Sequence, residues 1–497
     1  MCKHIGVTVV IVLLALAARA ADFNVRNHGA AGDGETLDTT AIQAAVDACH
    51  EAGGGRVLLD AGTYRTGTVF LKSGVTLHLV AGAVLRGSTA LDDYPVTHPD
   101  FRSYTDNYTE RSLIYAERAE NTGITGHGVI DGSGAEFEGE YKVRPYMIRS
   151  VECRDVAIED VTLRNSAMWT MHLLGCDNVR VNGVTIRTKV NKNNDGLDVD
   201  CSKNVRIANC DISSGDDAIV LKSTAFRATE NVVITNCVLN TDCNALKMGT
   251  ESNGGFKNIT INNCVIYDTR LAGLALEIVD GGTMDQVAVS NITMNGVGCP
   301  IFIRLGNRAR PPWDGAKVAG VGTLRNVSIS NIEARALDTI GCSITGLPGH
   351  PVENITLRDV RLTMPGGKRS RRDPFAVPQH EAKYPEYSMF GSLPSYGFFI
   401  RHAENLRLDG ITLRTGEPDA RQAIICDDVN GLSIDALKVT RQSGRPDLLF
   451  RNVRHGQVRA AWAGAQGDYL LGLAGDKNAD VLVPEDARVS VVNVSAD

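Results

Sequence analysis

Residues 204–212 read NVRIANCDI, residues 231–239 read NVVITNCVL and residues 258–266 read NITINNCVI. Each copy starts 27 residues after the last and alternates apolar with polar residues, with no helical periodicity between copies. Alternation indicates short strands, and a fixed period of this length is typical of a solenoid. The repeat therefore predicts coils that stack on one another at the ordinary inter-strand spacing of about 4.8 Å.

Copies of the same unit, some of them less regular, extend through most of the chain. They begin at Asn178, Asn204, Asn231, Asn258, Gln286, Asn326, Asn354 and Asn405. The fold class we expect is all-β, a single-stranded right-handed parallel β-helix of about ten or more coils. The 40-residue interval after Gln286 and the 51-residue interval after Asn354 then mark insertions, the longer at about residues 365–395.

Stacking places residues of the same phase above one another. Asparagines at equivalent turns can bond side chain to side chain, and small thiols can fill the interior as apolar groups. We therefore expect Cys210, Cys237 and Cys264 to be buried packing residues rather than metal or redox groups.

The N-terminal region carries a helical pattern. Thr39 or Thr40 can cap a helix over about residues 39–51, which Gly53 and the glycines after it would end. Such a helix would cover the open edges of the first coil. We expect one β-helix domain over residues 21–497, with a closing segment at about 440–497, because a solenoid grows by adding coils.

Residues 1–20 read as a signal peptide. Lys3 precedes an apolar run from Ile5 to Ala18, and Ala18-Arg19-Ala20 has the form of a cleavage site. The run is short of the roughly 20 residues that a membrane span needs. We expect a secreted or periplasmic protein without stable membrane insertion.

Composition excludes some classes of partner and scaffold. The net charge of −7 gives no basic surface for a nucleic acid, and 43% hydrophobic with 22% charged residues is typical of a globular chain. Eleven cysteines would remain after the signal peptide, too scattered for a small disulfide scaffold. We expect a monomer.

Two neighbouring coils carry a dense acidic cluster. The segment from Asn193 to Asp198 reads NNDGLD, and Asp216 and Asp217 follow Asp195 by about one coil. Carboxylates brought side by side repel one another, so at least one stays protonated as an acid while others remain ionised as bases. Glycosidic bond cleavage needs that division of roles.

Three other interpretations of the cluster stay open. Asp and Gly are common at turns, so any single aspartate here has a structural explanation. Clustered carboxylates also bind calcium, and a calcium-dependent lyase would use Lys222 or Lys247 as its base. A β-helix that binds carbohydrate without cleaving it is the third.

Four segments together resemble glycoside hydrolase family 28, the polygalacturonase-like pectinases. They are the opening residues 22–34, WTMH at 169–172, NNDGLD at 193–198 and GDDAI at 215–219, and the resemblance extends to about residue 440. It implies a pectic polysaccharide or oligosaccharide as substrate, with no metal and no cofactor.

The resemblance also implies roles for individual residues. Asp216 would be the general acid of an inverting hydrolase, while Asp195 and Asp217 position and deprotonate the attacking water. Asn193 and Asp198 belong to the same motif and would contact substrate. Inversion needs about 6.5–9.5 Å between acid and base, which stacking across coils can provide.

The chain departs from the family where polygalacturonases grip a galacturonate carboxylate. Asn244 stands where the Gly-His-Gly histidine is expected, and Ala275-Leu276-Glu277 stands in place of Arg-Ile-Lys. We therefore expect a neutral neighbouring sugar such as rhamnose. A rhamnogalacturonan or a modified galacturonan then fits better than plain homogalacturonan.

Five further residues are candidates for substrate binding. Matching Ala-Leu-Lys, Ala-Leu-Glu and Phe-Ile-Arg aligns Lys247, Glu277 and Arg304 in one ladder, which either neutralises itself or binds substrate. His172 either holds a sugar hydroxyl or is a buried histidine bonded to backbone. Arg401 would wall the cleft, and an insertion that closes one end would favour exo action.

Overall fold

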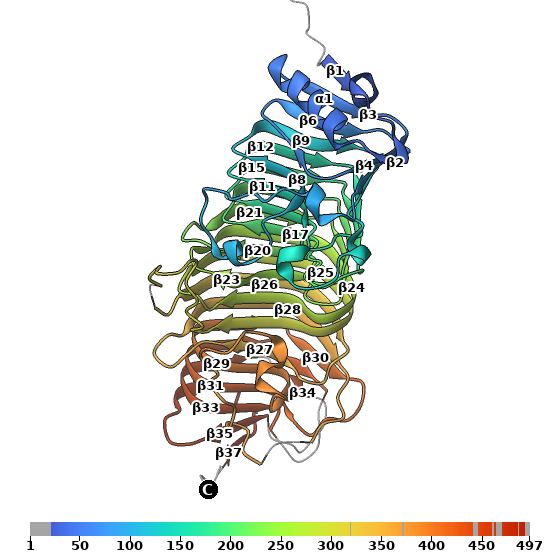
Figure 1. The fold of residues 1–497 in the computed structure, drawn as a ribbon. Coiled ribbons are helices and arrows are strands. Elements are labelled where there is room, and N and C mark those ends of the chain that lie inside the picture. Colours follow the sequence, from blue (N-terminus) through green and yellow to red (C-terminus); the bar gives the residue numbers. More distant parts are fainter. Residues whose placement is uncertain are drawn as a thin grey trace, which may run out of the picture.

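The computed structural model describes residues 21–318, 320–369, 372–440, 446–459, 462–463, 470–485 and 487–492. Its strands stack in parallel along one elongated body, with the N-terminal and C-terminal coils at opposite ends (Figure 1). This arrangement confirms an all-β fold built on parallel strands. The predicted signal peptide lies outside the described residues.

Each coil contributes strands to three stacks. Sheet 1 consists of β1 (Ala21–Asn24), β3 (Gly55–Leu59), β6 (Val75–Leu79), β9 (Glu120–Gly126), β12 (Arg154–Glu159), β15 (Asp177–Asn182), β18 (Lys203–Ala208), β21 (Thr229–Thr235) and β36 (Ala479–Leu482), and of parts of the longer strands named below.

Sheet 2 follows sheet 1 along each coil. It consists of β2 (Asp33–Leu37), β4 (Gly62–Thr66), β7 (Ala83–Gly87), β10 (Val129–Asp131), β13 (Thr162–Arg164), β16 (Thr185–Thr188), β19 (Asp211–Ser214), β22 (Val238–Thr241), β30 (Thr412–Thr415), β32 (Lys438–Val439) and β34 (Trp462–Ala463).

Sheet 3 carries the site described below. It consists of β5 (Val69–Phe70), β8 (Ser112–Glu117), β11 (Tyr146–Val151), β14 (Met171–Leu174), β17 (Leu197–Asp200), β20 (Ile219–Ser223), β23 (Leu246–Ser252), β27 (Cys342–Thr345), β35 (Leu471–Ala474) and β37 (Val489–Val492).

Seven longer strands bend from one sheet into the next and so join the stacks. They are β24 (Gly255–Ile278), β25 (Thr283–Leu305), β26 (Thr323–Ala336), β28 (Val352–Met364), β29 (Ser395–Asp409), β31 (Gln422–Asp435) and β33 (Leu448–Arg459).

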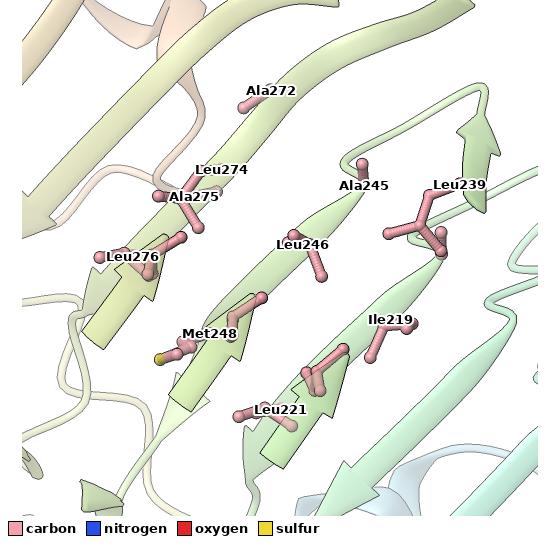
Figure 2. Close-up of a cluster of buried hydrophobic side chains, with 14 of the residues drawn as sticks. Ile219, Leu221, Leu239, Ala245, Leu246, Met248, Ala272, Leu274, Ala275 and Leu276 are labelled. Atoms are coloured by element: carbon pink, nitrogen blue, oxygen red, sulfur yellow. The ribbon is translucent and has the colours of Figure 1, made fainter. Parts of the chain in front are cut away.

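The space between the sheets is filled by aliphatic side chains. In sheet 3, Leu246 of β23 pairs with Leu274 of β24, and both are buried. Figure 2 shows them in one cluster with Ile219 and Leu221 of β20. Successive side chains of a strand alternate in direction. The residues that alternate with these buried ones along each strand therefore face outward and can contact a ligand.

The turn between sheet 3 and sheet 1 carries the predicted asparagine ladder. Asn204 donates to Asn178 at 3.1 Å, Asn231 to Asn204 at 3.0 Å and Asn258 to Asn231 at 2.7 Å. Each of them has a positive φ of 55–59°. Asparagine tolerates this left-handed conformation better than most residues, so each turn selects the same residue.

The stacked cysteines are interior packing residues, as the repeat predicts. Cys210, Cys237 and Cys264 are all at least 98% buried. Every cysteine from Cys49 to Cys426 is a free thiol in the described chain.

The predicted helix is α1 (Thr39–Glu51), which packs Ile42 and Val46 inward and contacts β1, β3 and β6. Its predicted cap is wrong: Asp38 occupies the N-cap position. The Asp38 carboxylate turns back to accept from the N–H groups of Ala31 and Gly32, and Thr39 Oγ1 accepts from Gly67.

Three long connections lie between β7 and β8, between β25 and β26, and between β28 and β29. The remaining helices are short 3-10 turns, η1 (Val25–His28), η2 (Leu91–Asp93), η3 (Tyr104–Asn107), η4 (Gly134–Glu136), η5 (Tyr141–Val143) and η6 (Tyr387–Phe390). Among the described residues, no helix combines the length and apolarity that crossing a membrane requires.

Candidate active site

The acidic cluster lies at the start of two neighbouring strands of sheet 3. Asp195 precedes β17, and Asp216 and Asp217 precede β20. Gly196 N–H donates to the Asp217 carbonyl at 2.8 Å, so the two entry segments lie side by side. The structure thus brings the three predicted catalytic aspartates together.

Asp217 is the ionised member of the cluster. Its Oδ1 accepts from the backbone N–H and the side-chain amide of Asn244, at 3.0 and 2.9 Å, and its Oδ2 pairs with Lys247 Nζ at 3.0 Å. Burial alone would raise the pKa of Asp217, but Lys247, Lys222 and Asn244 together hold it below its usual range. A carboxylate kept charged in this way suits a general base.

Asp216 has the opposite character. It is half-buried, whereas Asp195 and Asp217 are only 3% exposed. Burial and the neighbouring Asp217 charge raise the pKa of Asp216. A carboxyl that retains its proton beside an ionised neighbour suits a general acid.

Lys222 of β20 lies among acidic groups of the two neighbouring coils. Its Nζ lies 3.8 Å from Asp195, 3.6 Å from Asp198 and 3.6 Å from Glu251, and 4.6 Å from the centre of the Trp169 ring. Burial raises the pKa of Asp195 and Asp198 well above the usual range despite this ammonium. Carboxylates also keep the pKa of Lys222 high, so the lysine stays protonated.

Asp216 and Asp217 lie close together at the entry to β20. One oxygen of each lies within 4.8 Å of the other and of the Cys243 sulfur. The predicted separation of roughly 6.5–9.5 Å concerns carboxyls on stacked coils, such as Asp216 and Asp195, whereas Asp216 and Asp217 are adjacent residues of one turn. Both Asp217 oxygens already accept from Asn244 and Lys247, whose ammonium supplies the positive charge that a metal ion would bring.

The predicted ladder of Lys247, Glu277 and Arg304 is wrong at its first step. Lys247 pairs in register with Ala275, whereas Glu277, two residues further along the strand, pairs with Arg304. Arg304 is fully buried and donates to the carbonyls of Gln379 and His380 in the 365–395 insertion. It therefore anchors that insertion rather than neutralising Glu277.

Glu277 is a buried acid without a hydrogen-bond partner. It is 1% exposed, and neither carboxylate oxygen has a partner among the described residues. Burial raises the pKa of Glu277 to about 8, although Lys247 opposes the shift. Glu386 of the insertion lies on the same side, with its Oε2 3.5 Å from the Asn244 amide nitrogen. Burial raises the pKa of Glu386 as well.

The remaining predicted residues lie around the cluster. His172 pairs in register with Asp198 but is fully buried and bonds to the Asp200 carboxylate at 3.2 Å, so it neither faces an open cleft nor bonds to backbone. Asn193 accepts from Arg144 at 2.9 Å. Arg401 lies at a separate cavity.

Sequence reasoning missed several residues that enclose the cluster. Arg310, in the connection between β25 and β26, pairs with Glu251 and lies 3.5 Å over the Tyr104 ring. Tyr104 and Tyr108 come from the connection between β7 and β8, and Tyr108 packs on Trp169. The 40-residue interval signalled the first connection, but no repeat spacing marks the second, because it precedes the regular coils.

The match to a family model decides what kind of site this is. The model for glycosyl hydrolases family 28 matches residues 67–377, a range that contains the three aspartates and most of the regular coils. The chain belongs to this family.

Two curated relatives share part of this region. A protein of Vitis vinifera named "Probable polygalacturonase" is 36% identical over 228 residues, which is 42% of this chain and 46% of that protein. The "Exo-poly-alpha-D-galacturonosidase" of Dickeya chrysanthemi is 31% identical over 249 residues, 39% of this chain and 41% of that protein. The chain thus matches less than half the length of either relative.

A solved structure supports the fold. The exopolygalacturonase of Thermotoga maritima superimposes with a TM-score of 0.59 at 24% identity, covering 69% of this chain and 87% of the other. At that identity the likeness concerns the fold alone.

Proposed function

We propose that this chain is an exported hydrolase that cleaves a glycosidic bond in a pectic polysaccharide or oligosaccharide with inversion at the anomeric carbon. The observation that carries the proposal is the contrast between Asp216 and Asp217 in a member of this family. Neighbouring carboxyls have pKa values shifted in opposite directions, so an acid and a base are present together at one pH.

In the proposed reaction, Asp216 donates its proton to the glycosidic oxygen as the bond to the anomeric carbon breaks. Water attacks that carbon from the other side, and Asp217 takes the proton that the water loses. Asp195, held neutral by burial, donates a hydrogen bond that orients the water. The products are two saccharides, each with a free hydroxyl at the cleaved position. The step leaves Asp216 ionised and Asp217 protonated, and proton exchange with solvent restores the starting state.

A calcium-dependent lyase is the second candidate, and two observations weigh against it. A lyase needs a neutral base to abstract a proton, whereas the pKa values of Lys222 and Lys247 both lie well above the usual range because carboxylates surround them. Lys247 also holds a positive charge at the oxygens that calcium would need. We therefore propose a reaction that a chelator does not inhibit.

The substrate we propose has a neutral sugar beside the scissile bond, as in a rhamnogalacturonan or a modified galacturonan. A galacturonate carboxylate would lie near Glu277 and Glu386. The polygalacturonases that this sequence resembles carry the cations of Arg-Ile-Lys at this place. A protonated Glu277 can instead donate a hydrogen bond to a sugar hydroxyl. Repulsion sets in only when Glu277 or Glu386 ionises.

We further propose that the enzyme acts at chain ends. Asp195, Asp217 and Lys247 are each less than 5% exposed, and Tyr384 and Glu386 of the insertion lie over Lys247 and Asn244. An extended polysaccharide would need an open groove across these strands. A pocket that accepts one end of a chain suits exo action.

The test is incubation with purified pectic fragments, read by product mass. The proposal expects saturated products of one or two sugars from rhamnogalacturonan oligosaccharides, and a much slower reaction with oligogalacturonates. Unsaturated products that disappear with chelator would identify a lyase. Binding of every fragment without cleavage, retained when all three aspartates are replaced by asparagine, would identify a non-catalytic carbohydrate-binding protein.

A further inference from the structure

A cavity opens on sheet 3 away from the catalytic cluster. It encloses about 400 Å³ between residues 375–379 of the insertion and the strands β29, β31 and β33. Along the strand register, Arg401 is separated from Glu277 by three steps, through Arg304 and Thr345. At about 4.8 Å a step, the cavity lies about 14 Å from that end of the catalytic site.

Arg401 lines this cavity and carries an unused donor. The side chain is 2% exposed, and its two terminal nitrogens donate to the carbonyls of Val377 at 2.6 Å and Pro378 at 3.0 Å. Its Nε–H has no acceptor among the described residues. A buried charged donor without an acceptor is costly, so a ligand acceptor in the cavity would be bound favourably.

An unused acceptor lines the same cavity. The Gln379 amide nitrogen lies 2.9 Å from His402 Nε2, while the Gln379 Oε1 is buried and has no partner in the described part of the chain. Two side chains that line the cavity therefore carry an unused cationic donor and an unused neutral acceptor.

The charge around the cavity is positive. Its carboxylates are already engaged, since Asp427 accepts two bonds from Arg451 at 2.7 and 2.6 Å and Asp428 bonds to His402 at 2.7 Å. Exposed Arg454 and Lys477 line the rim. Four cationic side chains thus face two carboxylates, with His402 neutral because burial lowers its pKa.

We propose that this cavity binds a uronic acid residue of an acidic polysaccharide, as a carbohydrate site separate from the catalytic one. The sugar carboxylate would accept from Arg401 and the rim cations, and a hydroxyl would donate to Gln379 Oε1. Pockets for small ligands begin at about 300 Å³, so the cavity has room for one sugar ring. The site would hold the enzyme on an acidic polymer, whichever bond the catalytic site cleaves.

The test is the binding of the full-length protein to soluble polygalacturonate, measured by affinity gel electrophoresis with neutral galactan as the comparison polymer. The double variant Arg454→Ala with Lys477→Ala should bind polygalacturonate at least about tenfold more weakly, because it removes two charge-assisted contacts. Its hydrolysis of a short neutral-ended fragment should stay within about twofold of wild type, since both residues lie outside the catalytic pocket.

The matched control is Arg414→Ala with Lys438→Ala, which removes the same two charges from the exposed face of sheet 2. This control should bind like wild type. Arg401→Gln, with folding checked by thermal melting, should also lose polymer binding. Unchanged binding in the Arg454 and Lys477 variant, or an equal loss in the control, would overturn the proposal. Because hydrolysis is measured separately, its failure would count against the proposed function and not against this site.

Discussion

The asparagine turns and the outer face of sheet 3 belong to the same coils yet follow opposite rules. At the turn, Asn204, Asn231 and Asn258 repeat one residue with one conformation and one bonding pattern. On sheet 3, the same three coils present Val220, Lys247 and Ala275 in register. The turn meets an identical steric requirement in every coil, so it selects an identical residue.

The difference teaches where to look for function in a repeat fold. At positions that repeat, the side chains form their hydrogen bonds with the same residue in the coils above and below, as the ladder asparagines do. Positions that break the repeat, such as Lys247 beside Asp217, take partners from other coils and from the insertions. Substitutions at the turn should therefore lower stability, and substitutions on the outer face of sheet 3 should lower activity.

The largest effect is expected at the general acid. Asp216→Asn removes the proton donor while keeping shape, so hydrolysis of a pectic oligosaccharide should fall on the order of 10²–10⁴-fold. The control Asp211→Asn changes a carboxylate of the same coil on sheet 2 and should stay near wild type. Initial rates and thermal melting of both variants check this, and an active, folded Asp216→Asn would refute the assigned role.

The next largest effect concerns Lys247. Lys247→Met removes the ammonium that holds the pKa of Asp217 down, so that pKa should rise. A base works only when ionised, so the acid limb of kcat/KM should move about one to three pH units upward. Lys247→Arg should restore much of the wild-type profile, and Lys257→Met on the exposed face of sheet 1 should leave it unchanged. A profile unaffected by Lys247→Met would contradict the pairing.

The third prediction is that Glu277 makes the stability of the folded protein depend on pH. Its pKa is raised from 4.5 to about 8, so between these values the folded state holds a proton that the unfolded state lacks. Its contribution is therefore fully present below pH 4.5 and is lost as pH rises toward 8, by up to about 1.4 kcal/mol per pH unit. Melting curves recorded at several pH values give stability as a function of pH. Glu277→Gln should remove the loss of stability between pH 4.5 and 8, whereas the exposed control Glu333→Gln should keep it. An identical slope in both variants would disprove the shift.

The smallest effect is expected at the ladder. Asn231→Ala should lower stability by about 1–2 kcal/mol, because alanine is strained at positive φ and two side-chain bonds are lost. Asn231→Gly relieves the strain alone and should lose less. Denaturant unfolding tests both, with the exposed Arg206→Ala as a control, and hydrolysis should be unaffected. Lost activity in a stable Asn231→Ala would break the proposed division between turn and site.

The turns, the helix and the acidic cluster were readable from the sequence because each has a local cause. Asn204 and Asn231 share a conformation that few other residues tolerate, and α1 follows from the spacing of Ile42 and Val46. Asp195 and Asp217 meet because one coil of regular length separates them.

The rest depends on features that spacing does not encode. The error in the Lys247 ladder came from matching similar residues, whereas the register follows the interior pairing of Leu246 with Leu274, which Figure 2 shows. Glu386 and Arg310 reach the site through long connections, whose paths depend on tertiary contacts. Insertions can be located from interrupted periodicity, but their contacts cannot.

The central claim is that Asp216 and Asp217 together hydrolyse a pectic glycosidic bond with water as the nucleophile. Proton NMR of the wild-type protein acting on a rhamnogalacturonan oligosaccharide, recorded with and without chelator, tests it most directly. The account predicts that the first reducing-end signal belongs to the anomer opposite in configuration to the cleaved bond. A retained anomer, or vinyl signals of an unsaturated product that appear only without chelator, would contradict it.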